Sequence, residues 1–311
     1  MSSLPPSGVS AYLVDVPADS PFRLENERAY RAWRDRKLHA AESALTEPFI
    51  EIADPERPSP AEIDSIRAAC RANNMALYRM PALKGDESRT RQAMRALSAA
   101  LGLGRFEDHR SAGPDGIVPI EVADTGGRAG FIPFSTRAIN WHTDGYYSYR
   151  GPDRLIRAMV LHCVRDAADG GENGLLDQDV AYIRLRDDNP AHIEALMHPE
   201  AMTIPSFDDA EGPSHGAVAG PVFVVNGDHL TMRYTIRKRN IEWREDAALD
   251  RARNLLADVL EADPLIRRAR LNPDDGVACN NVLHDRRAFN NAEDGNKGRL
   301  LLRIRSYDRI G

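Results

Sequence analysis

Two short motifs, far apart in the chain, constrain this fold more than any other feature of the sequence. The first, Asn-Trp-His-Thr-Asp-Gly, contains His142 and Asp144, and the second, Asn-Asn-Val-Leu-His-Asp-Arg, contains His284. Two imidazoles and one carboxylate on one face of an octahedral metal leave three positions open, which suits non-haem Fe(II) holding a chelating cosubstrate together with O₂. We therefore predict that the fold brings these three side chains together.

A His-x-acid pair alone is weak evidence for a metal, because nine His and 47 acidic residues among 311 give about 1.4 such pairs by chance. The chain has three. His192 and Glu194 fall in a predicted helix, where residues two apart diverge, and His198 and Glu200 bracket a proline in a predicted turn. The pair in the first motif instead follows an apolar stretch, and an extended strand would aim both of its side chains to one side. Only that pair is interpreted as metal ligands.

Composition narrows the class of partner. With 311 residues and 42% hydrophobic content, the chain can bury a large core. Its net charge of −6 gives no overall electrostatic reason to bind nucleic acid or an anionic membrane. A small-molecule substrate is the expected partner, and the sequence leaves the oligomeric state open, a homo-oligomer included.

The cysteines and the N-terminus indicate the compartment. Cys70, Cys163 and Cys279 are few, far apart and odd in number, which argues against a disulfide framework and for a reducing environment. The N-terminal residues lack a basic segment, and no stretch approaches 18 continuous apolar residues. A cytoplasmic location is expected.

Apolar periodicity predicts an N-terminal accessory segment over residues 1–60 and one domain with a β core over residues 61–311. Ser59 and Pro60 form a good helix start, as cap and first-turn residue. Helices are predicted at about 25–44, 59–73, 88–101, 190–198 and 246–262, and strands at about 75–79, 117–122, 156–164, 222–225, 277–280 and 299–305. The helices after residue 190 are interpreted as inserts that cover one face of the sheets.

The last predicted strand has one nearly cationic face. Period-two alternation puts its side chains on opposite faces, with Arg299, Leu301, Arg303 and Arg305 on one and Leu300, Leu302 and Ile304 on the other. If the arginines point into a barrel they must find anions, because an unpaired buried charge is costly, and a dicarboxylic cosubstrate would supply one. The alternative is a solvent-exposed arginine face at a sheet edge.

The chain resembles the taurine dioxygenase (TauD/TfdA-like) family of Fe(II)- and 2-oxoglutarate-dependent oxygenases, from about residue 60 to the C-terminus. The resemblance is carried by Trp141-His142-Thr143-Asp144, by Gly170-Gly171-Glu172-Asn173, and by His284 followed by Arg299. It implies an α+β fold with a double-stranded β-helix (jelly-roll) core flanked by helices. It also implies a dioxygenase that uses Fe(II), 2-oxoglutarate and O₂, hydroxylates a small substrate, and releases succinate and CO₂.

The resemblance also assigns roles to residues. His142, Asp144 and His284 would hold iron, and Arg299 would clamp the distal carboxylate of 2-oxoglutarate. Asn173 stands where the family usually has Thr and would donate to the cosubstrate through its amide. Arg303 would contact cosubstrate or substrate. The polar loop of residues 290–297 makes the gap after His284 long, so Arg303 or Arg305 could exchange roles with Arg299.

Substrate residues are less constrained by the sequence. Asn140, Tyr146 and Tyr147 flank the first motif and are candidates to line the pocket, although such aromatic residues are as often core packing. Arg233, in Thr-Met-Arg-Tyr-Thr, resembles a family segment near the substrate and hints at an anionic substrate. A structural ion pair is the alternative role for Arg233.

Two other functions fit parts of the same pattern. The three ligands could hold zinc in a metal-assisted hydrolase or isomerase, which would leave Arg299 and the Gly-Gly-Glu-Asn segment without a role. A catalytically inert barrel that binds a small acid would tolerate the loss of any ligand. All three ligands and the arginine are present, which favours the oxygenase.

Overall fold

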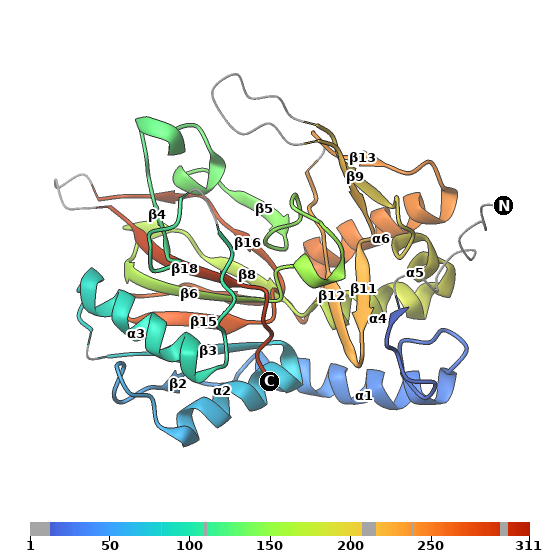
Figure 1. The fold of residues 1–311 in the computed structure, drawn as a ribbon, viewed down its shortest axis with the longest axis horizontal. Coiled ribbons are helices and arrows are strands. Elements are labelled where there is room, and N and C mark those ends of the chain that lie inside the picture. The colour runs from blue at the N-terminus through green and yellow to red at the C-terminus, as the bar shows by residue number, and fades with distance from the viewer. Residues whose placement is uncertain (1–12, 82, 109–110, 207–215, 238, 293–297) are drawn as a thin grey trace. The chain divides into compact units, whose positions relative to one another are not determined.

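The computed structural model describes residues 13–81, 83–108, 111–206, 216–237, 239–292 and 298–311 (Figure 1). The chain forms two compact units built from alternating segments. Unit 1 comprises Met1–Glu42, Gly145–Leu155 and Gln178–Ile266, and unit 2 comprises Ser43–Asp144, Ile156–Asp177 and Arg267–Gly311. The predicted boundary at residue 60 falls inside unit 2, because the strand Ile50–Glu51 pairs in parallel with Met75–Arg79 and joins the sheet of that unit.

Both units mix helices and strands, as the predicted α+β class requires. Unit 1 holds the helices α1 (Glu27–Ala44), α4 (Gln178–Asp188), α5 (Pro190–Leu196) and α6 (Ala247–Ala262), although the end of α1 lies just inside unit 2. Unit 2 holds α2 (Pro60–Asn73) and α3 (Glu87–Ala100). Short 3₁₀ turns occur at Gly126–Arg128, Ile132–Phe134 and Pro152–Arg154. All five predicted helices are confirmed to within a few residues. None of the helices among the described residues is both long and apolar enough to cross a membrane.

The strands within the described ranges form five sheets. Unit 1 holds β1 (Leu13–Val14), β9 (Met202–Ile204), β10 (Val218–Gly220), β11 (Phe223–Asn226), β12 (His229–Met232) and β13 (Glu242–Trp243), in the orders β1-β11-β12 and β10-β9-β13. Unit 2 holds β2 (Ile50–Glu51), β3 (Met75–Arg79), β4 (Val118–Glu121), β5 (Ile139–His142), β6 (Ala158–Arg165), β7 (Asp169–Gly170), β8 (Asn173–Leu176), β14 (Arg267–Ala269), β15 (Asp275–Cys279), β16 (Leu283–Arg286), β17 (Phe289–Asn290) and β18 (Leu300–Ser306). Their orders are β2-β3-β15-β6-β18-β4, β14-β8-β16-β5 and β17-β7.

Unit 2 is layered around its six-stranded sheet. Helices α2 and α3 pack on one face of this sheet (Figure 1), and their apolar side chains form one buried cluster with Leu300, Leu302 and Ile304. The opposite face contributes Leu301 to a second buried cluster, which also includes Leu175 from β8 of the four-stranded sheet. The alternation predicted for the last strand is therefore confirmed, and it directs the aliphatic residues into two separate cores.

Helix α2 begins as its sequence predicts. The Ser59 hydroxyl accepts from the backbone N–H of Glu62 at 3.3 Å, and the Glu62 carboxylate accepts from the Ser59 N–H at 2.6 Å. This reciprocal pair satisfies two N–H groups that a helix start leaves without partners. The helix delivers the chain directly to β3 through Asn74, which has a left-handed φ of 57°.

The alternative prediction, that the arginine face of the last strand is exposed to solvent at a sheet edge, is wrong. Strand β18 pairs with β6 on one side and β4 on the other, so it lies inside the sheet rather than at its edge. Arg299 and Arg305 are 5% and 4% exposed. Their positive charges must therefore be compensated by groups inside unit 2.

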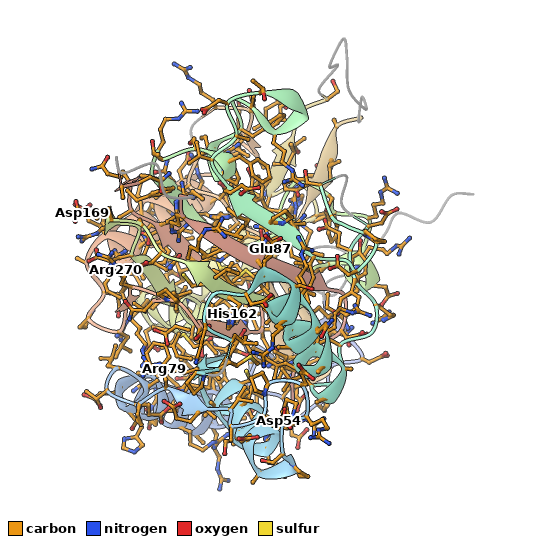
Figure 2. The ribbon with its side chains drawn as sticks, turned by 90° about the vertical axis from the view of Figure 1, so that its left-hand side faces the viewer. Asp54, Arg79, Glu87, His162, Asp169 and Arg270 are labelled. Atoms are coloured by element: carbon orange, nitrogen blue, oxygen red, sulfur yellow. The ribbon has the colours of Figure 1, made fainter. Side chains whose placement is uncertain are left out.

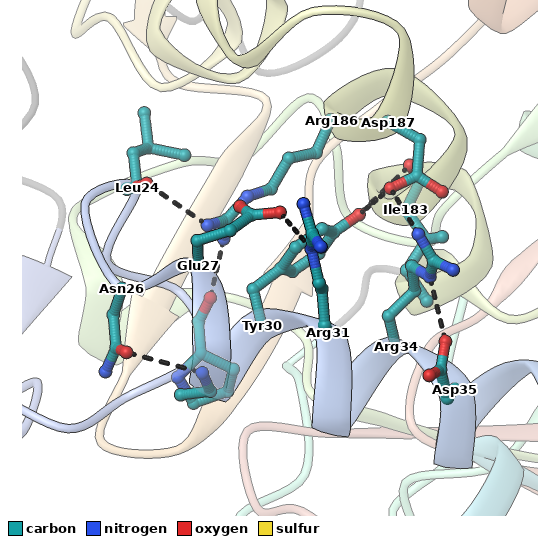
Figure 3. Close-up of polar contacts among 12 residues, drawn as sticks. Leu24, Asn26, Glu27, Tyr30, Arg31, Arg34, Asp35, Ile183, Arg186 and Asp187 are labelled. Atoms are coloured by element: carbon teal, nitrogen blue, oxygen red, sulfur yellow. Dashed lines mark hydrogen bonds and ion pairs between the residues drawn. The ribbon is translucent and has the colours of Figure 1, made fainter.

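Unit 1 contains a helix that the sequence pattern did not predict. Helix α4 is buried on nearly every side, so its apolar residues show no amphipathic period. Arg186 on this helix lies 3.8 Å from the ring centre of Tyr30 and donates to the backbone oxygens of Pro21, Arg23 and Leu24 (Figure 3). The buried guanidinium of Arg186 thereby holds the segment before α1 against α4.

His162 on β6 is fully buried in unit 2 (Figure 2), and its ring stacks on that of Tyr78 with a centroid separation of 5.7 Å. Burial lowers the pKa of His162 to about 4. The unfolded chain takes up this proton near pH 6.5, whereas the folded protein takes it up only near pH 4. The unfolded state therefore binds more protons across this window, and stability falls as the pH is lowered through it.

Replacing His162 with phenylalanine removes this titration and keeps a ring beside Tyr78. Between pH 7.5 and pH 5, we expect the loss in free energy of unfolding to be about 2 kcal/mol smaller in His162→Phe than in the wild type. Urea unfolding of the metal-free proteins at the two pH values measures this difference. Equal losses in the two proteins would contradict the assignment.

Candidate metal centre

The two predicted histidine ligands face each other on neighbouring strands of unit 2. His142 ends β5, His284 lies on β16, and the antiparallel register pairs them directly, with ring centroids 4.3 Å apart. Asp144 follows His142 by two residues, and one ligand atom from each of the three side chains lies within 4.8 Å of the others. They form the one group of this kind among the described residues. The predicted ligand set is thus brought together.

Backbone carbonyls fix the orientation of both imidazoles. Nδ1 of His142 lies 2.8 Å from the oxygen of Asn140, and Nδ1 of His284 lies 2.8 Å from the oxygen of Val282. A carbonyl oxygen only accepts, so each Nδ1 carries the proton and each Nε2 keeps its lone pair in the neutral ring. Such outer hydrogen bonds orient metal-binding histidines and set their tautomer.

The carboxylate of Asp144 presents its two oxygens differently. Oδ1 accepts from Nη1 of Arg303 at 3.0 Å and from Nη1 of Arg305 at 3.3 Å. Oδ2 is buried and has no hydrogen-bond partner among the described residues. A buried oxygen without a partner is costly unless a cation or donor meets it. Together with two lone pairs on imidazole nitrogens, it fits a divalent transition metal.

Charges around the cluster keep its ligands in their metal-binding forms. Burial alone would raise the pKa of Asp144, but Arg303 and Arg305, followed by the two imidazoles, outweigh it and hold that pKa well below its ordinary value. Burial, reinforced by the neighbouring His284, lowers the pKa of His142 to about 3. The carboxylate is therefore ionised and His142 neutral at neutral pH.

Glu107 joins this cluster although the sequence pattern did not single it out. Its carboxylate forms an ion pair with Nη2 of Arg305, and its backbone N–H donates to the oxygen of Arg305 at 3.0 Å. Burial raises the pKa of Glu107 despite the arginine. Its surroundings in the sequence, Arg-Phe-Glu-Asp, read as an ordinary polar turn, and only the backbone pairing beside β18 brings the carboxylate to Arg305.

Replacing Glu107 with glutamine removes one anionic partner of the buried Arg305, which also contacts Asp144. We expect this variant to lose about 3 kcal/mol of unfolding free energy, because breaking a buried pair leaves an under-compensated charge. Urea unfolding measures the loss. The matched control is Glu121→Gln, which changes an exposed glutamate on β4 opposite β18 and is expected to shift stability by no more than about 0.5 kcal/mol. Equal stability of the two variants would contradict the role given to Glu107.

Arg299 is a buried cation that forms no ion pair with any of the described residues. Its guanidinium donates to the oxygen of Gly171 at 3.5 Å and lies over the ring of Phe289, 5.0 Å from the ring centre. Burial lowers the pKa of Arg299, which is the cost of placing this charge away from water. Arg303 and Arg305 already contact Asp144, so Arg299 is the member of the cationic face that pairs with no carboxylate in the described part of the chain. Part of the polar loop before it, residues 293–297, lies outside the described residues.

The Gly-Gly segment packs too closely to carry side chains. A Cβ at Gly170 would collide with the backbone oxygen of Ala288, and one at Gly171 would lie 3.3 Å from Nε of Arg299. Both glycines have positive φ, near 75°. The segment then enters β8 at Asn173, which is buried and whose Nδ2 finds no hydrogen-bond partner in the part of the chain that the structure describes. The buried cation Arg299 therefore lies against this segment, and Nδ2 of Asn173, a buried donor without a described hydrogen-bond partner, follows it along the chain.

The residues predicted to contact the substrate are divided between the two units, with Asn140 in unit 2 and Tyr146, Tyr147 and Arg233 in unit 1. Asn140 is exposed on β5 and orients His142 through its backbone oxygen. Tyr146 and Tyr147 are half-buried in unit 1 and pack edge to face at 5.3 Å. Arg233 is 1% exposed and donates to the backbone oxygens of Tyr146, Met202, Gly220 and Val218, at 2.7 to 3.3 Å. Burial lowers its pKa to about 10. Its donors serve carbonyl groups of unit 1 rather than the acidic partner that the ion-pair alternative required.

Comparison with known proteins places these features in context. The model of the family described as "Taurine catabolism dioxygenase TauD, TfdA family" matches residues 38–305. A uridine-5'-phosphate dioxygenase from Amycolatopsis sp is 33% identical over 178 residues, which cover 53% of this chain and 60% of that protein. One from Streptomyces sp is 31% identical over 182 residues, with the same coverage. The matched part therefore spans about 60% of the length of these relatives.

Solved structures resemble this fold at low sequence identity. The non-haem iron oxygenase OrfP in complex with Fe and alpha-ketoglutaric acid is 17% identical, with a TM-score of 0.58 and coverage of 89% of this chain and 92% of that one. Asparagine oxygenase in complex with Fe(II), 2S,3S-3-hydroxyasparagine and succinate is 15% identical, with a TM-score of 0.52 and coverage of 94% and 92%. At these identities the likeness concerns the fold.

Proposed function

The chain belongs to the TauD, TfdA family of dioxygenases, and from this premise we propose that it is an Fe(II)- and 2-oxoglutarate-dependent enzyme that hydroxylates a small anionic substrate. The observation that carries the proposal is the convergence of His142, Asp144 and His284, whose ligand atoms lie within 4.8 Å of one another. The two-histidine, one-carboxylate set is the donor set that non-haem Fe(II) oxygenases use. The packing of the six-stranded sheet of unit 2 against its four-stranded sheet is consistent with the proposed jelly-roll core.

The chemistry that bound iron supplies is the coupling of 2-oxoglutarate oxidation, by O₂, to succinate and CO₂ with insertion of oxygen into the substrate. The residues of the chain would hold and orient the metal and the cosubstrate. His142 and His284 would bind the metal through Nε2, because each Nδ1 donates to a backbone oxygen. Arg303 and Arg305 hold Oδ1 of Asp144, so Oδ2 is the oxygen left for the metal.

Arg299 and Asn173 are proposed to bind 2-oxoglutarate. A planar guanidinium can grip a carboxylate through two parallel N–H groups, and a buried one without a carboxylate gains most from such a partner. The Nδ2 group of Asn173 adds a donor that no described residue uses. Arg303 and Arg305 are less suited to the clamp, because both already donate to Asp144.

A nucleoside 5'-monophosphate is the first substrate to test. Support comes from the two curated relatives, each named as a uridine-5'-phosphate dioxygenase. The charge on the site agrees with an anion. Arg303, Arg305, Asp144 and Glu107 sum to zero, so a divalent metal and Arg299 bring three positive charges that a dianionic cosubstrate does not fully neutralise. Amino acids are the second class, because the solved structures of similar fold include ones with hydroxylated asparagine and arginine.

Anaerobic titration of Fe(II) and 2-oxoglutarate into the metal-free protein tests the cosubstrate assignment. We expect a weak visible charge-transfer band from the chelate, followed, after admission of O₂ with a panel of nucleotides and amino acids, by substrate-dependent release of succinate. A zinc hydrolase or an inert barrel would give neither. Absence of the band from iron-loaded protein would refute 2-oxoglutarate as cosubstrate, and succinate release with amino acids alone would refute the nucleotide class.

A further inference from the structure

We propose that Asn281 is a positioning residue that fixes Asp144 and also closes the base of the segment Gly145–Leu155. The inference rests on the proposed function insofar as Asp144 binds a metal. Asn281 lies in the turn between β15 and β16, three residues before His284. It was not among the residues that the sequence pattern selected.

The side chain of Asn281 is wholly engaged with two backbone sites. Its Oδ1 accepts from the N–H of Asp144 at 2.8 Å, and its Nδ2 donates to the oxygen of Asp144 at 3.0 Å and to the oxygen of Ile156 at 2.8 Å. Asn281 is 2% exposed. Both amide hydrogens and the amide oxygen are therefore used, out of contact with water, on the main chain of a proposed metal ligand and of one other residue.

Asp144 and Ile156 lie at the points where the chain passes between the two units. Asp144 is the last residue of unit 2 before the chain enters unit 1 at Gly145, and Ile156 is the first residue of unit 2 after it returns. Asn281 therefore ties together the two points where the segment Gly145–Leu155 leaves and re-enters unit 2. This segment carries Tyr146 and Tyr147, the aromatic residues predicted for the substrate pocket.

The backbone of Asn281 explains why asparagine suits the position. Its φ is 53°, in the left-handed region, which asparagine tolerates better than most residues and glycine adopts without strain. Asn281→Gly therefore keeps the turn and removes only the amide. Asn281→Asp keeps the size and the acceptor for the Asp144 N–H, but it replaces two donors with oxygen facing carbonyl oxygens.

Loss of the amide leaves one buried N–H and two buried carbonyls without their partner, so the main chain at Asp144 loses its anchor. Loss of an outer-shell partner of a metal ligand typically lowers metal affinity about 10- to 100-fold. Because Asn281 also holds Ile156, we expect the segment Gly145–Leu155 to open more often, which faster amide hydrogen exchange would report.

The test uses the full chain and two readouts that need no turnover: anaerobic calorimetry with Fe(II), and hydrogen exchange by mass spectrometry. We expect Asn281→Gly to bind Fe(II) about 10- to 100-fold more weakly and to exchange faster in Gly145–Leu155 than the wild type. Asn281→Asp is expected to do the same and replaces Asn281→Gly if the latter does not fold. The matched control is Asn240→Gly, an exposed asparagine with a φ of 60°, which should match the wild type in both readouts.

Three results would overturn the inference: unchanged Fe(II) affinity, unchanged exchange in Gly145–Leu155, or faster exchange across the whole of unit 2, which indicates general destabilisation. Failure of the proposed function is distinguishable from these. A wild type that binds Fe(II) but releases no succinate would refute the proposed reaction and leave both readouts for Asn281 intact.

Discussion

Replacing His284 with alanine is expected to abolish succinate release and to weaken Fe(II) binding by more than the roughly 100-fold that loss of an outer-shell partner costs. The physical reason is the loss of one of three ligands that the chain supplies. The remaining His142 and Asp144 leave the metal with too few protein donors to compete with water. Anaerobic calorimetry with Fe(II) measures the affinity, and a coupled succinate assay measures turnover.

The control for this variant is His229→Ala, which removes an exposed histidine on β12 of unit 1. It should bind Fe(II) and turn over like the wild type. His284 is not a metal ligand if its alanine variant binds Fe(II) as tightly as the control does. The same comparison separates a ligand from a residue that merely stabilises β16, because the latter would lower the melting temperature with little change in affinity.

Replacing Arg299 with alanine should raise the dissociation constant for 2-oxoglutarate by about 100-fold, which corresponds to about 2.7 kcal/mol, within the range for truncating one partner of a buried charge pair. Lysine at this position should recover only part of the affinity, because an ammonium cannot form the two parallel bonds of a guanidinium. Fe(II) affinity should stay unchanged. The titration followed through the charge-transfer band measures each constant.

The free protein offers a second test of this assignment. Because Arg299 is buried with no carboxylate partner among the described residues, an apolar side chain of similar length should stabilise the cosubstrate-free protein or leave it unaffected. Arg299→Met is therefore expected to unfold in urea no more easily than the wild type while binding 2-oxoglutarate poorly. Marked destabilisation by Arg299→Met would indicate a structural arginine, and a larger loss of affinity in Arg303→Ala would move the clamp to Arg303.

Local sequence signals sufficed for some elements. The capping box at Ser59 acts within one turn of helix, and the alternation of leucine and arginine along β18 acts within one strand, so both could be predicted from neighbours in the sequence. The clustering of His142, Asp144 and His284 could be predicted because histidines are few in this chain and a two-histidine, one-carboxylate set has a specific chemistry. Helix α4 could not, since a helix buried on nearly all sides shows no period.

Other features depend on contacts between distant segments. Glu107 and Asn281 reach Arg305 and Asp144 only because separate strands and turns converge, and neither has a local pattern that distinguishes it from ordinary polar residues. The division into two units escapes the sequence for a related reason, since each unit is assembled from three separate segments. The sequence predicted which side chains come together in the candidate site better than which side chains hold them in place.

The direct pairing of His142 with His284 across β5 and β16 makes metal binding a gauge of strand register. In a β-sheet, a slip of one residue turns every side chain of the slipped strand to the opposite face. A slipped β16 would keep its hydrogen-bonded ladder and most of its circular dichroism, yet it would point His284 away from His142. Metal uptake during refolding would then count only chains in the native alignment, and it would separate misaligned species that spectroscopy of the backbone alone would count as folded.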